Sequence, residues 1–505
     1  MIVELFKQDF KITQSAHQAH LVYRVDIPAG LTEMDVHFHY GPIVERDKES
    51  IIKAVVREGL SESIIQEDTT VRNLLTVSMN DPVSFRGAHH FFSEEQKIKI
   101  NTEEATEGFI AGKIHEGYWE FIISCHGVFS EEVTGQLAVF GVTESDLMKK
   151  EEIIPFKNLG FQQIVKNRSR HSTNEAKQVK RIELHSHTVH SDAPQKTEEL
   201  LRQAEKEKID WLAITDHNTM TALLEAEQHH HFNTKVKLLN GIEYTTFYGH
   251  FLVHGQREKI IFDWTKLSKQ RISQYFENLQ KEDVYITIAH PFDGGNPFCT
   301  GCRWEYILKN LKYVDAIEVW NSTNPHKSLS NEDAFYQWKS LLKQGYEIAA
   351  SSGRDWHRLY PGEEIAYTYI LVSQDETEEE MINSLKLGRT YISIRPQIDF
   401  KVNEIHILGD SVEDETGELA LSINMDQIKD GDILRIYSQE SLIFEKVFTN
   451  EHQWKEKIQL YNEGYSLLRI EVLNKELERV AFTNPIYIHR INEKGGHNIG
   501  KRFDS

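Results

Sequence analysis

Cysteine, long apolar runs and basic charge are all scarce in this chain of 505 residues. Three cysteines, an odd number, do not make the disulfide framework of a small secreted scaffold. No uninterrupted apolar stretch reaches the roughly 18 residues that a membrane helix needs, and the first residues lack the apolar run of a signal peptide. We therefore expect a cytoplasmic protein that does not cross a membrane.

The charge balance is strongly acidic. The formal net charge is −21 at pH 7, from 57 Lys and Arg against 78 Asp and Glu. This excess argues against general attraction to nucleic acid or to anionic membrane surfaces. A hydrophobic content of 39% describes a globular protein, and the length predicts several domains, each with its own core.

The pattern of the chain changes twice and predicts three domains. Residues 1–175 contain short β-rich runs between Gly, Pro, Asn and Asp turns, which indicates an N-terminal β-sandwich. In residues 176–395, strand-like runs alternate with amphipathic helices, which predicts a parallel sheet with crossover helices, most easily closed into a barrel. Residues 396–505 return to alternating strands and predict a second, Ig-like β-sandwich. The polar stretch 166–180 is expected to link the first two domains.

The middle domain opens with RIELHSHTVHSD at residues 181–192. Side chains alternate along a strand, so His185 and His187 project together while Ile182 and Leu184 face a core. Two imidazoles on one rigid strand suit the chelation of a single metal ion. Taken alone the pattern is weak, because a chain with 25 His contains such pairs by chance.

Further ligand-type residues follow at the carboxyl ends of the predicted strands, where a barrel builds its active site. They are Asp192 after the first strand, His217 in TDHN, Glu243 in GIE, His250 in GH, His290 in AHP, and Asp355 and His357 in GRDWH. Imidazole and carboxylate without thiolate suit Zn, Mn or Fe. The set exceeds what one ion can use, and a carboxylate such as Glu243 can bridge two cations that hold a shared hydroxide.

Charge counting predicts a small anionic substrate. Three carboxylates against three divalent cations leave the pocket positive even with a hydroxide bound, and against two they leave it neutral. Arg354, directly before Asp355, is a candidate clamp for phosphate oxygens, although an arginine beside an aspartate is about as often part of a structural ion pair.

These ordered segments resemble the motifs of the polymerase and histidinol phosphatase (PHP) superfamily. The WH ending and YGHFLVHG are similar to its CehA/McbA-like branch. The resemblance covers about residues 180–390. It implies a distorted seven-stranded, TIM-like (β/α) barrel with up to three metals and, in most members, hydrolysis of phosphoester bonds by a metal-bridging hydroxide.

The resemblance also assigns ligands residue by residue. It implies a first metal on His185, His187, Glu243 and Asp355, a second on Glu243, His250 and His290, and a third on Asp192, His217 and His357. If the third site is empty, His217 or His357 would protonate the leaving oxygen. Arg354 would stabilise the developing negative charge, but the superfamily often has a small residue there, so its role is open.

Other residues compete with these assignments. His254 is a weaker alternative to His250, and Asp216 is expected to orient the ligands or to cap a helix. His89 and His90 are expected to be surface or structural residues, because no carboxylates accompany them at ligand-like spacing.

Cys299 and Cys302 form a CxxC that allows three interpretations. They are a redox pair, half of a structural zinc site, or, as we favour, a reduced pair in a segment that shapes the substrate pocket.

The sequence as a whole predicts a metal-dependent hydrolase, a phosphoesterase acting on a small phosphomonoester or phosphodiester. The alternative within the enzymes is hydrolysis of a carboxylic or carbamic ester or an amide at the same metal site. A hypothesis from another class is a metal-containing binding protein without activity, against which the full ligand set argues.

Overall fold

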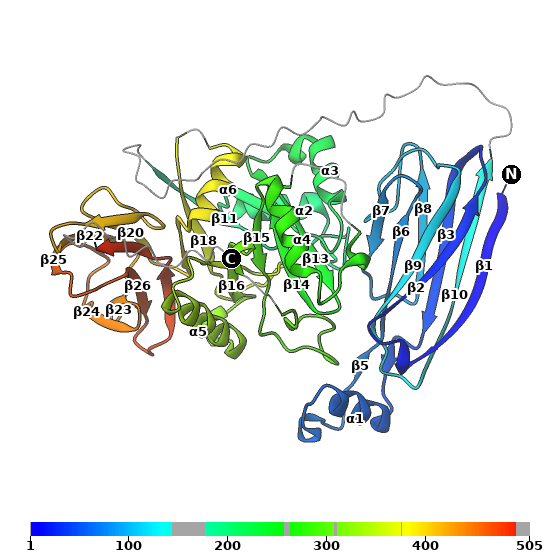
Figure 1. Ribbon diagram of the computed structural model, residues 1–505, viewed down its shortest axis with the longest axis horizontal. Helices are drawn as coiled ribbons and strands as arrows, with labels where there is room; N and C mark the ends of the chain where they lie inside the picture. The colour runs from blue at the N-terminus through cyan, green and yellow to red at the C-terminus, as the bar shows by residue number, and fades with distance from the viewer. Residues whose placement is uncertain (1, 144–176, 257–262, 308–310, 375, 491–505) are drawn as a thin grey trace.

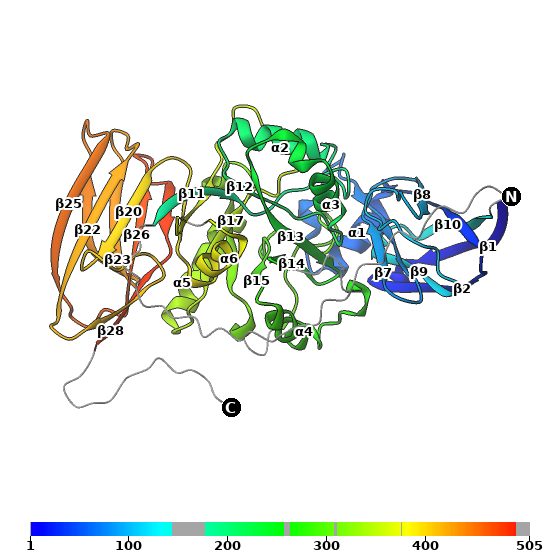
Figure 2. The same ribbon diagram turned by 90° about the horizontal axis from the view of Figure 1, so that it is seen from above.

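The computed structural model describes residues 2–143, 177–256, 263–307, 311–374 and 376–490. Three parts lie in a row along the long axis, with a β-rich N-terminal part, a mixed α/β middle part and a β-rich C-terminal part (Figure 1). The view from above shows the same order (Figure 2). The protein is therefore mixed α/β. The linker expected at 166–180 lies mostly outside the described residues, and its last three residues already belong to strand β11 (Gln178–Glu183).

The N-terminal part has two four-stranded antiparallel sheets, ordered β1-β10-β3-β8 and β2-β9-β6-β7. Their bounds are β1 (Ile2–Thr13), β2 (Ala19–Ile27), β3 (Leu31–Gly41), β6 (Leu74–Asn80), β7 (Phe85–His89), β8 (Glu95–Asn101), β9 (Gly117–Gly127) and β10 (Glu132–Thr143). A short pair, β4 (Val44–Glu45) and β5 (Val71–Arg72), flanks helix α1 (Lys48–Arg57). Alternate residues such as Val36 and Phe38 of β3 meet Val77 and Phe121 in one apolar core between the sheets.

The middle part alternates strands and helices. Its elements are β11, α2 (Thr197–Lys206), β12 (Trp211–Ile214), α3 (Thr221–Gln228), β13 (Lys237–Thr246), β14 (Gly249–His254), α4 (Ile272–Leu279), β15 (Tyr285–Ile288), β16 (Ala316–Asn321), α5 (Leu329–Lys343), β17 (Ala349–Gly353), β18 (Tyr367–Val372), α6 (Glu378–Leu387) and β19 (Thr390–Ser393). Helix α2 shows why these segments form: Leu200, Leu201 and Ala204 bury one face, and Glu199 accepts a hydrogen bond from the backbone nitrogen of Lys196 at the amino end.

The expectation of an all-parallel sheet is wrong in two places. Strands β11, β12 and β13 are parallel, as are β15, β16 and β17, but β14 runs antiparallel to both β13 and β15. Only two residues connect β13 to β14, too few for the crossover that parallel strands require. Strand β18 is the other exception and runs antiparallel to β11.

The middle strands form an open run and not a closed ladder. Among the described strands, no ladder joins β17 back to β11. One isolated parallel bridge, between Ser186 and Trp356, links the chain beyond the ends of these two strands. The sheet instead continues through β18 and β19 into the C-terminal part, because β19 pairs with β27.

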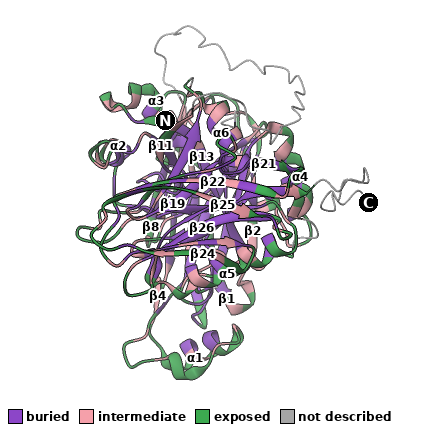
Figure 3. Ribbon diagram, turned by 90° about the vertical axis from the view of Figure 1, so that its left-hand side faces the viewer, coloured by how far each residue is buried: buried purple, intermediate pink, exposed green. Residues whose placement is uncertain are grey.

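The C-terminal part places the three-stranded sheet β20-β22-β25 against the continuation of the central sheet. Its strands are β20 (Gln397–Val402), β21 (Ser411–Asp414), β22 (Glu418–Asp426), β23 (Ile433–Ser438), β24 (Ser441–Val447), β25 (Gln453–Tyr461), β26 (Leu467–Leu473), β27 (Arg479–Thr483) and β28 (Ile486–Arg490). Buried residues gather along the interior strands and exposed ones at the margins (Figure 3). In the described part of the chain, no helix is both long and apolar enough to span a membrane.

Candidate metal centre

The residues predicted as ligands come together at the edge of the sheet where the parallel central strands have their carboxyl ends; His250 reaches it from the amino end of the antiparallel strand β14. Hydrogen bonds from the backbone nitrogen of His187 to the carbonyl oxygen of Trp356 (3.0 Å), and from that of Trp356 to the carbonyl oxygen of His185 (3.1 Å), join the first and last segments. Gly353 permits this approach, because a Cβ there would lie 2.3 Å from the Cβ of His185. The segments HSH and GRDWH, about 170 residues apart in the chain, are therefore side by side.

Glu243 lies at the centre of the group and is fully buried in β13. Its Oε2 is 3.4 Å from Nε2 of His185 and 3.5 Å from Nε2 of His187. Its Oε1 is 3.1 Å from Nδ1 of His250 and 3.1 Å from Nε2 of His290. Nδ1 of His217 also lies 2.8 Å from Oε2. One carboxylate thus faces five imidazoles, three on Oε2 and two on Oε1.

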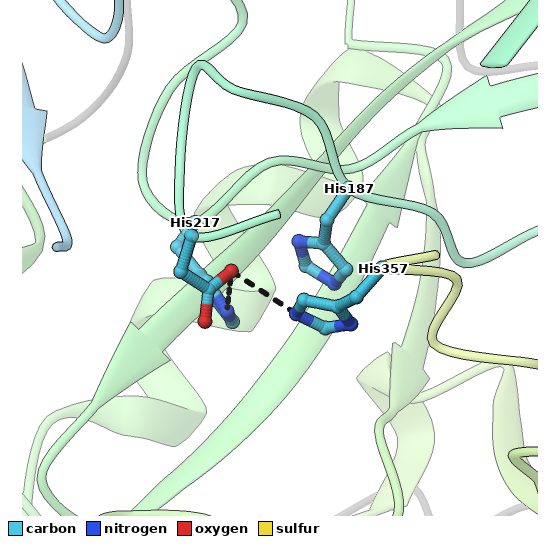
Figure 4. A group of neighbouring side chains, drawn as sticks. His187, His217 and His357 are labelled. Atoms are coloured by element: carbon cyan, nitrogen blue, oxygen red, sulfur yellow. Dashed lines mark hydrogen bonds and ion pairs between the residues drawn. The ribbon is translucent and has the colours of Figure 1, made fainter. Parts of the chain in front are cut away.

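Two further carboxylates complete the group toward solvent. Asp355 Oδ1 lies 2.8 Å from Nε2 of His187. Asp192 Oδ1 lies 3.0 Å from Nε2 of His357 and 3.4 Å from Nε2 of His217. Figure 4 shows the rings of His187, His217 and His357 gathered around one point. The side chains of Asp355 and His357 are 27% and 26% exposed, so the group opens to solvent on this side.

Four sets of ligand atoms in this cluster are close enough together to hold a cation. They are His187, Asp192, His217 and His357; His185, Glu243 and His290; His185, His187 and Asp355; and His217, Glu243 and His250. All nine predicted ligands occur in these sets, but the grouping differs from the predicted one. His187 also faces the predicted third site, and His250 and His290 fall in separate sets that share Glu243.

The cluster leaves many buried atoms without a hydrogen bond. Among the described residues these include Nε2 of His185, Nε2 of His187, Oε2 of Glu243, Nε2 of His250, Nδ1 of His290 and Oδ1 of Asp355. Nε2 of His185 and of His187 lie 2.8–3.5 Å from Oε2 of Glu243 and Oδ1 of Asp355, but not in hydrogen-bonding geometry. Since buried polar atoms are normally satisfied, a concentration of such atoms on facing side chains fits divalent cations held between them.

The electrostatics of the cluster also favour bound cations. Burial alone would raise the pKa of Glu243, but His217, His185 and His250 outweigh burial and hold that pKa well below its usual range. Burial alone would lower the pKa of His217, but Asp192 and Glu243 outweigh it and raise that pKa well above its usual range. The buried carboxylates therefore stay ionised and draw positive charge to themselves.

Glu318, a buried carboxylate in β16, was not among the residues predicted for the site. Its Oε1 accepts a hydrogen bond from Nδ1 of His185 at 3.0 Å, and its Oε2 accepts one from the backbone nitrogen of His290 at 2.9 Å. The first bond places the proton of His185 on Nδ1 and leaves Nε2 free to face the cluster. An acidic residue inside the apolar strand AIEVWN could have indicated this role.

Arg354 does not occupy the position expected of a phosphate clamp. Its Nε donates to Oε2 of Glu183 at 2.8 Å, its Nη1 lies 2.9 Å from Oε2 of Glu207, and its guanidinium stacks 3.6 Å above the ring of Trp356. Two carboxylates hold the guanidinium in a structural ion pair, the alternative that the sequence left open for Arg354, and this geometry argues against the predicted catalytic role. Glu183 Oε1 also accepts from the backbone nitrogens of His185 and Arg354, so the ion pair ties the two ligand-bearing segments together.

Two competing residues have structural contacts. Nε2 of His254 donates to the carbonyl oxygen of Leu184 at 2.8 Å, whereas His250 faces Glu243. Asp216 accepts from the backbone nitrogen of Thr188 (2.7 Å) and from the hydroxyl of Ser191, and so fixes the loop between two predicted ligands.

The structure differs from the expectation at the CxxC segment and at one histidine of the N-terminal part. Cys299 and Cys302 form a disulfide, which corrects the expectation that they are reduced. Their loop lies against the cluster, because a Cβ at Gly301 would be 3.4 Å from Nε2 of His250. His90 belongs to the N-terminal part, but the centre of its ring lies 4.6 Å from the centre of the His217 ring. The spacing of ligand residues in the sequence did not predict this contact.

Comparison with known proteins identifies one domain. Residues 183–281 match the PHP domain family, so the chain contains a PHP domain. A two-domain protein from Bacteroides vulgatus, described as containing a predicted PHP-like metal-dependent phosphoesterase, shares 16% identity over 65% of this chain and all of its own, with a TM-score of 0.37.

Two other solved structures are more distant. A putative metal-dependent phosphoesterase from Bifidobacterium adolescentis shares 15% identity over 35% of this chain and 87% of its own, with a TM-score of 0.24. An amidohydrolase from Chromobacterium violaceum with bound sulfate shares 16% identity over 36% and 88%, with a TM-score of 0.22. No curated protein sequence matches the chain.

Proposed function

From the PHP domain at residues 183–281, we propose that this protein is a metal-dependent hydrolase that cleaves phosphate monoesters or diesters. The observation that carries the proposal is the convergence of nine histidine and carboxylate side chains, many with buried atoms that lack hydrogen bonds. Two or three divalent ions such as Zn, Mn or Fe suit this set. We take strands β11–β17 as a distorted barrel whose carboxyl end carries the centre.

The residues that would hold cations are those of the four sets described above, with Glu243 shared between ions. When bound, such ions lower the pKa of water and neutralise negative charge on phosphoryl oxygens. The chain supplies their placement: Glu318 fixes the ring of His185, and Asp216 fixes the loop that carries Asp192.

His357 is the residue best placed to give a proton to the leaving oxygen. Its Nδ1 donates to the carbonyl oxygen of Asp355 at 2.8 Å, which leaves Nε2 beside Asp192 on the side that opens to solvent. Burial lowers its pKa, but Asp355 and Asp192 outweigh burial and raise the pKa of His357 to about 9. A ring that carries this proton can act as a general acid when it does not bind a cation.

A second candidate substrate is an uncharged carboxylic or carbamic ester or an amide. The observation that favours it is the engagement of Arg354 by Glu183 and Glu207, which removes the arginine expected to bind an anion. The predicted positive charge of the metal-loaded pocket favours the phosphate ester. We therefore place the phosphate ester first.

The test is a hydrolysis panel on full-length protein of measured metal content. A phosphomonoester, a phosphodiester and a carboxylic ester would share one chromogenic leaving group. The proposal predicts turnover of a phosphate ester that stops on chelation and returns on addition of metal. Turnover of the carboxylic ester alone would favour the second candidate, and no metal-dependent turnover of any of the three would count against both.

A further inference from the structure

The N-terminal part packs directly beside the metal cluster. Figure 1 shows β7 on the side of this part that faces the central strands. Phe85 and Ala88 of β7 belong to the same apolar core as Phe251 of β14. The backbone nitrogen of Gly108 donates to Oγ1 of Thr221 at 3.0 Å across the same boundary. The two parts therefore share a buried interface that fixes their relative position.

Strand β7 ends at His89, and the next residue, His90, has different surroundings. His89 forms a hydrogen bond from Nδ1 to Oε1 of Gln96 at 2.8 Å, and its ring lies 4.0 Å from that of Phe91. His90, which follows directly, has its ring 4.6 Å from that of His217 in the metal cluster. Side chains of neighbouring extended residues point to opposite sides. The imidazole of His89 therefore contacts its own domain, and that of His90 faces the cluster.

Neighbouring rings hold the imidazole of His90 in place, but one of its nitrogens has no hydrogen bond to the described residues. Its ring packs edge-on against His126 at 5.1 Å and against Phe92 at 6.2 Å. Only 5% of the residue is exposed, and its Nδ1 has no hydrogen-bond partner among the described residues. It belongs to none of the four ligand sets. A buried imidazole that has an unpartnered nitrogen and packs against a ring of the candidate ligand cluster is suited to bind a group that arrives with the substrate.

We propose that His90 hydrogen-bonds the substrate bound at the metal cluster, so that the catalytic site is assembled from two domains. This inference rests on the proposed function and adds a binding residue to it. An imidazole offers a nitrogen donor to an oxygen of a phosphate group or of the leaving alcohol. The N-terminal domain would then take part in selecting the ester.

The probe is inorganic phosphate, titrated calorimetrically into full-length protein of measured metal content. The variants are His90→Phe, which keeps a ring of similar size but removes both nitrogens, and His90→Asn, which restores a donor. The matched control is His89→Gln, because it alters the adjacent buried imidazole without touching the cluster. Thermal unfolding of each variant is followed in parallel, and His90→Ala replaces the Phe variant if that variant does not fold.

The proposal predicts that His90→Phe binds phosphate about tenfold more weakly, the effect of one hydrogen bond to a charged group. Metal content should stay at the wild-type level, His90→Asn should recover part of the affinity, and His89→Gln should bind as the wild type does. Unchanged affinity in His90→Phe, an equal loss in His89→Gln, or loss of metal in His90→Phe would each overturn it. If the metal-loaded wild type neither binds phosphate nor turns over a phosphate ester, the proposed function itself fails.

Discussion

Buried charges occur in both the C-terminal domain and the metal cluster, but they are arranged differently. In the C-terminal domain two buried carboxylates meet arginines: Asp432 accepts from both terminal nitrogens of Arg395, at 2.8 and 2.9 Å, and Glu471 pairs with Arg469 and Arg479. In the cluster, Glu243 Oε1 and Asp192 Oδ1 accept hydrogen bonds from imidazoles, but Oε2 of Glu243, Oδ1 of Asp355 and four imidazole nitrogens have no partner among the described residues.

The presence or absence of hydrogen-bond partners distinguishes charges that stabilise the fold from charges that are suited to bind a ligand. Bidentate arginine and carboxylate pairs satisfy each other's hydrogen-bonding groups, so they need nothing from outside the chain. In the cluster, an added cation would satisfy both the imidazole nitrogens and the carboxylate oxygens that have no hydrogen bond. Burial alone would not distinguish the two regions, whereas the unpartnered atoms do.

Glu243→Gln should have the largest effect, because it removes one charge from the carboxylate shared by several ligand sets while keeping its shape. We expect turnover to fall by at least about a thousandfold and bound metal to be lost. Metal analysis and steady-state kinetics check this. The matched control is Glu471→Gln, which should lower the unfolding temperature and leave metal content and turnover nearly unchanged. Wild-type activity in Glu243→Gln would contradict the conclusion that the cluster, unlike the paired charges of the C-terminal domain, binds the metal.

Arg354→Met should act on stability, because it leaves Glu183 buried without its partner. We expect a loss of about 3–5 kcal/mol in the free energy of unfolding, measured by denaturant titration. Any loss of turnover should be similar for a phosphate ester and a neutral ester, since the guanidinium does not reach the cluster. A much larger loss on the phosphate ester would restore Arg354 as an anion clamp.

Glu318→Gln should have the smallest effect of the three. The amide can still accept from His185 but carries no charge, and we expect metal affinity to fall about 10–100-fold, as for other partners of metal-bound histidines. Competition with a chromogenic chelator measures this, and high metal concentration should restore turnover. Metal affinity equal to that of the wild type would show that Glu318 only supports the backbone of His290.

Much of the site could be predicted because ligand residues followed strand ends in order. The expectation of mixed α/β structure is confirmed, and so is the resemblance to the PHP superfamily. The apolar residues beside His185 and His187 fixed which way these side chains point. The assignment of individual ligands to individual ions is still a prediction.

Other features depend on contacts that no local pattern contains. Arg354 turns away from the cluster because Glu183 and Glu207 attract it, and Glu207 lies on a distant stretch of chain. His90 reaches the cluster only because a separate domain packs there. The antiparallel course of β14 was readable from its two-residue connection, but the alternation of strands and helices suggested a uniform parallel sheet.

The most direct test of the account is the metal content of the full-length protein, measured by elemental mass spectrometry beside turnover, before and after chelation and metal addition. The account predicts two or three divalent ions per chain, lost on chelation together with turnover and regained with it. A folded protein that keeps full turnover with fewer than one ion per chain would contradict it.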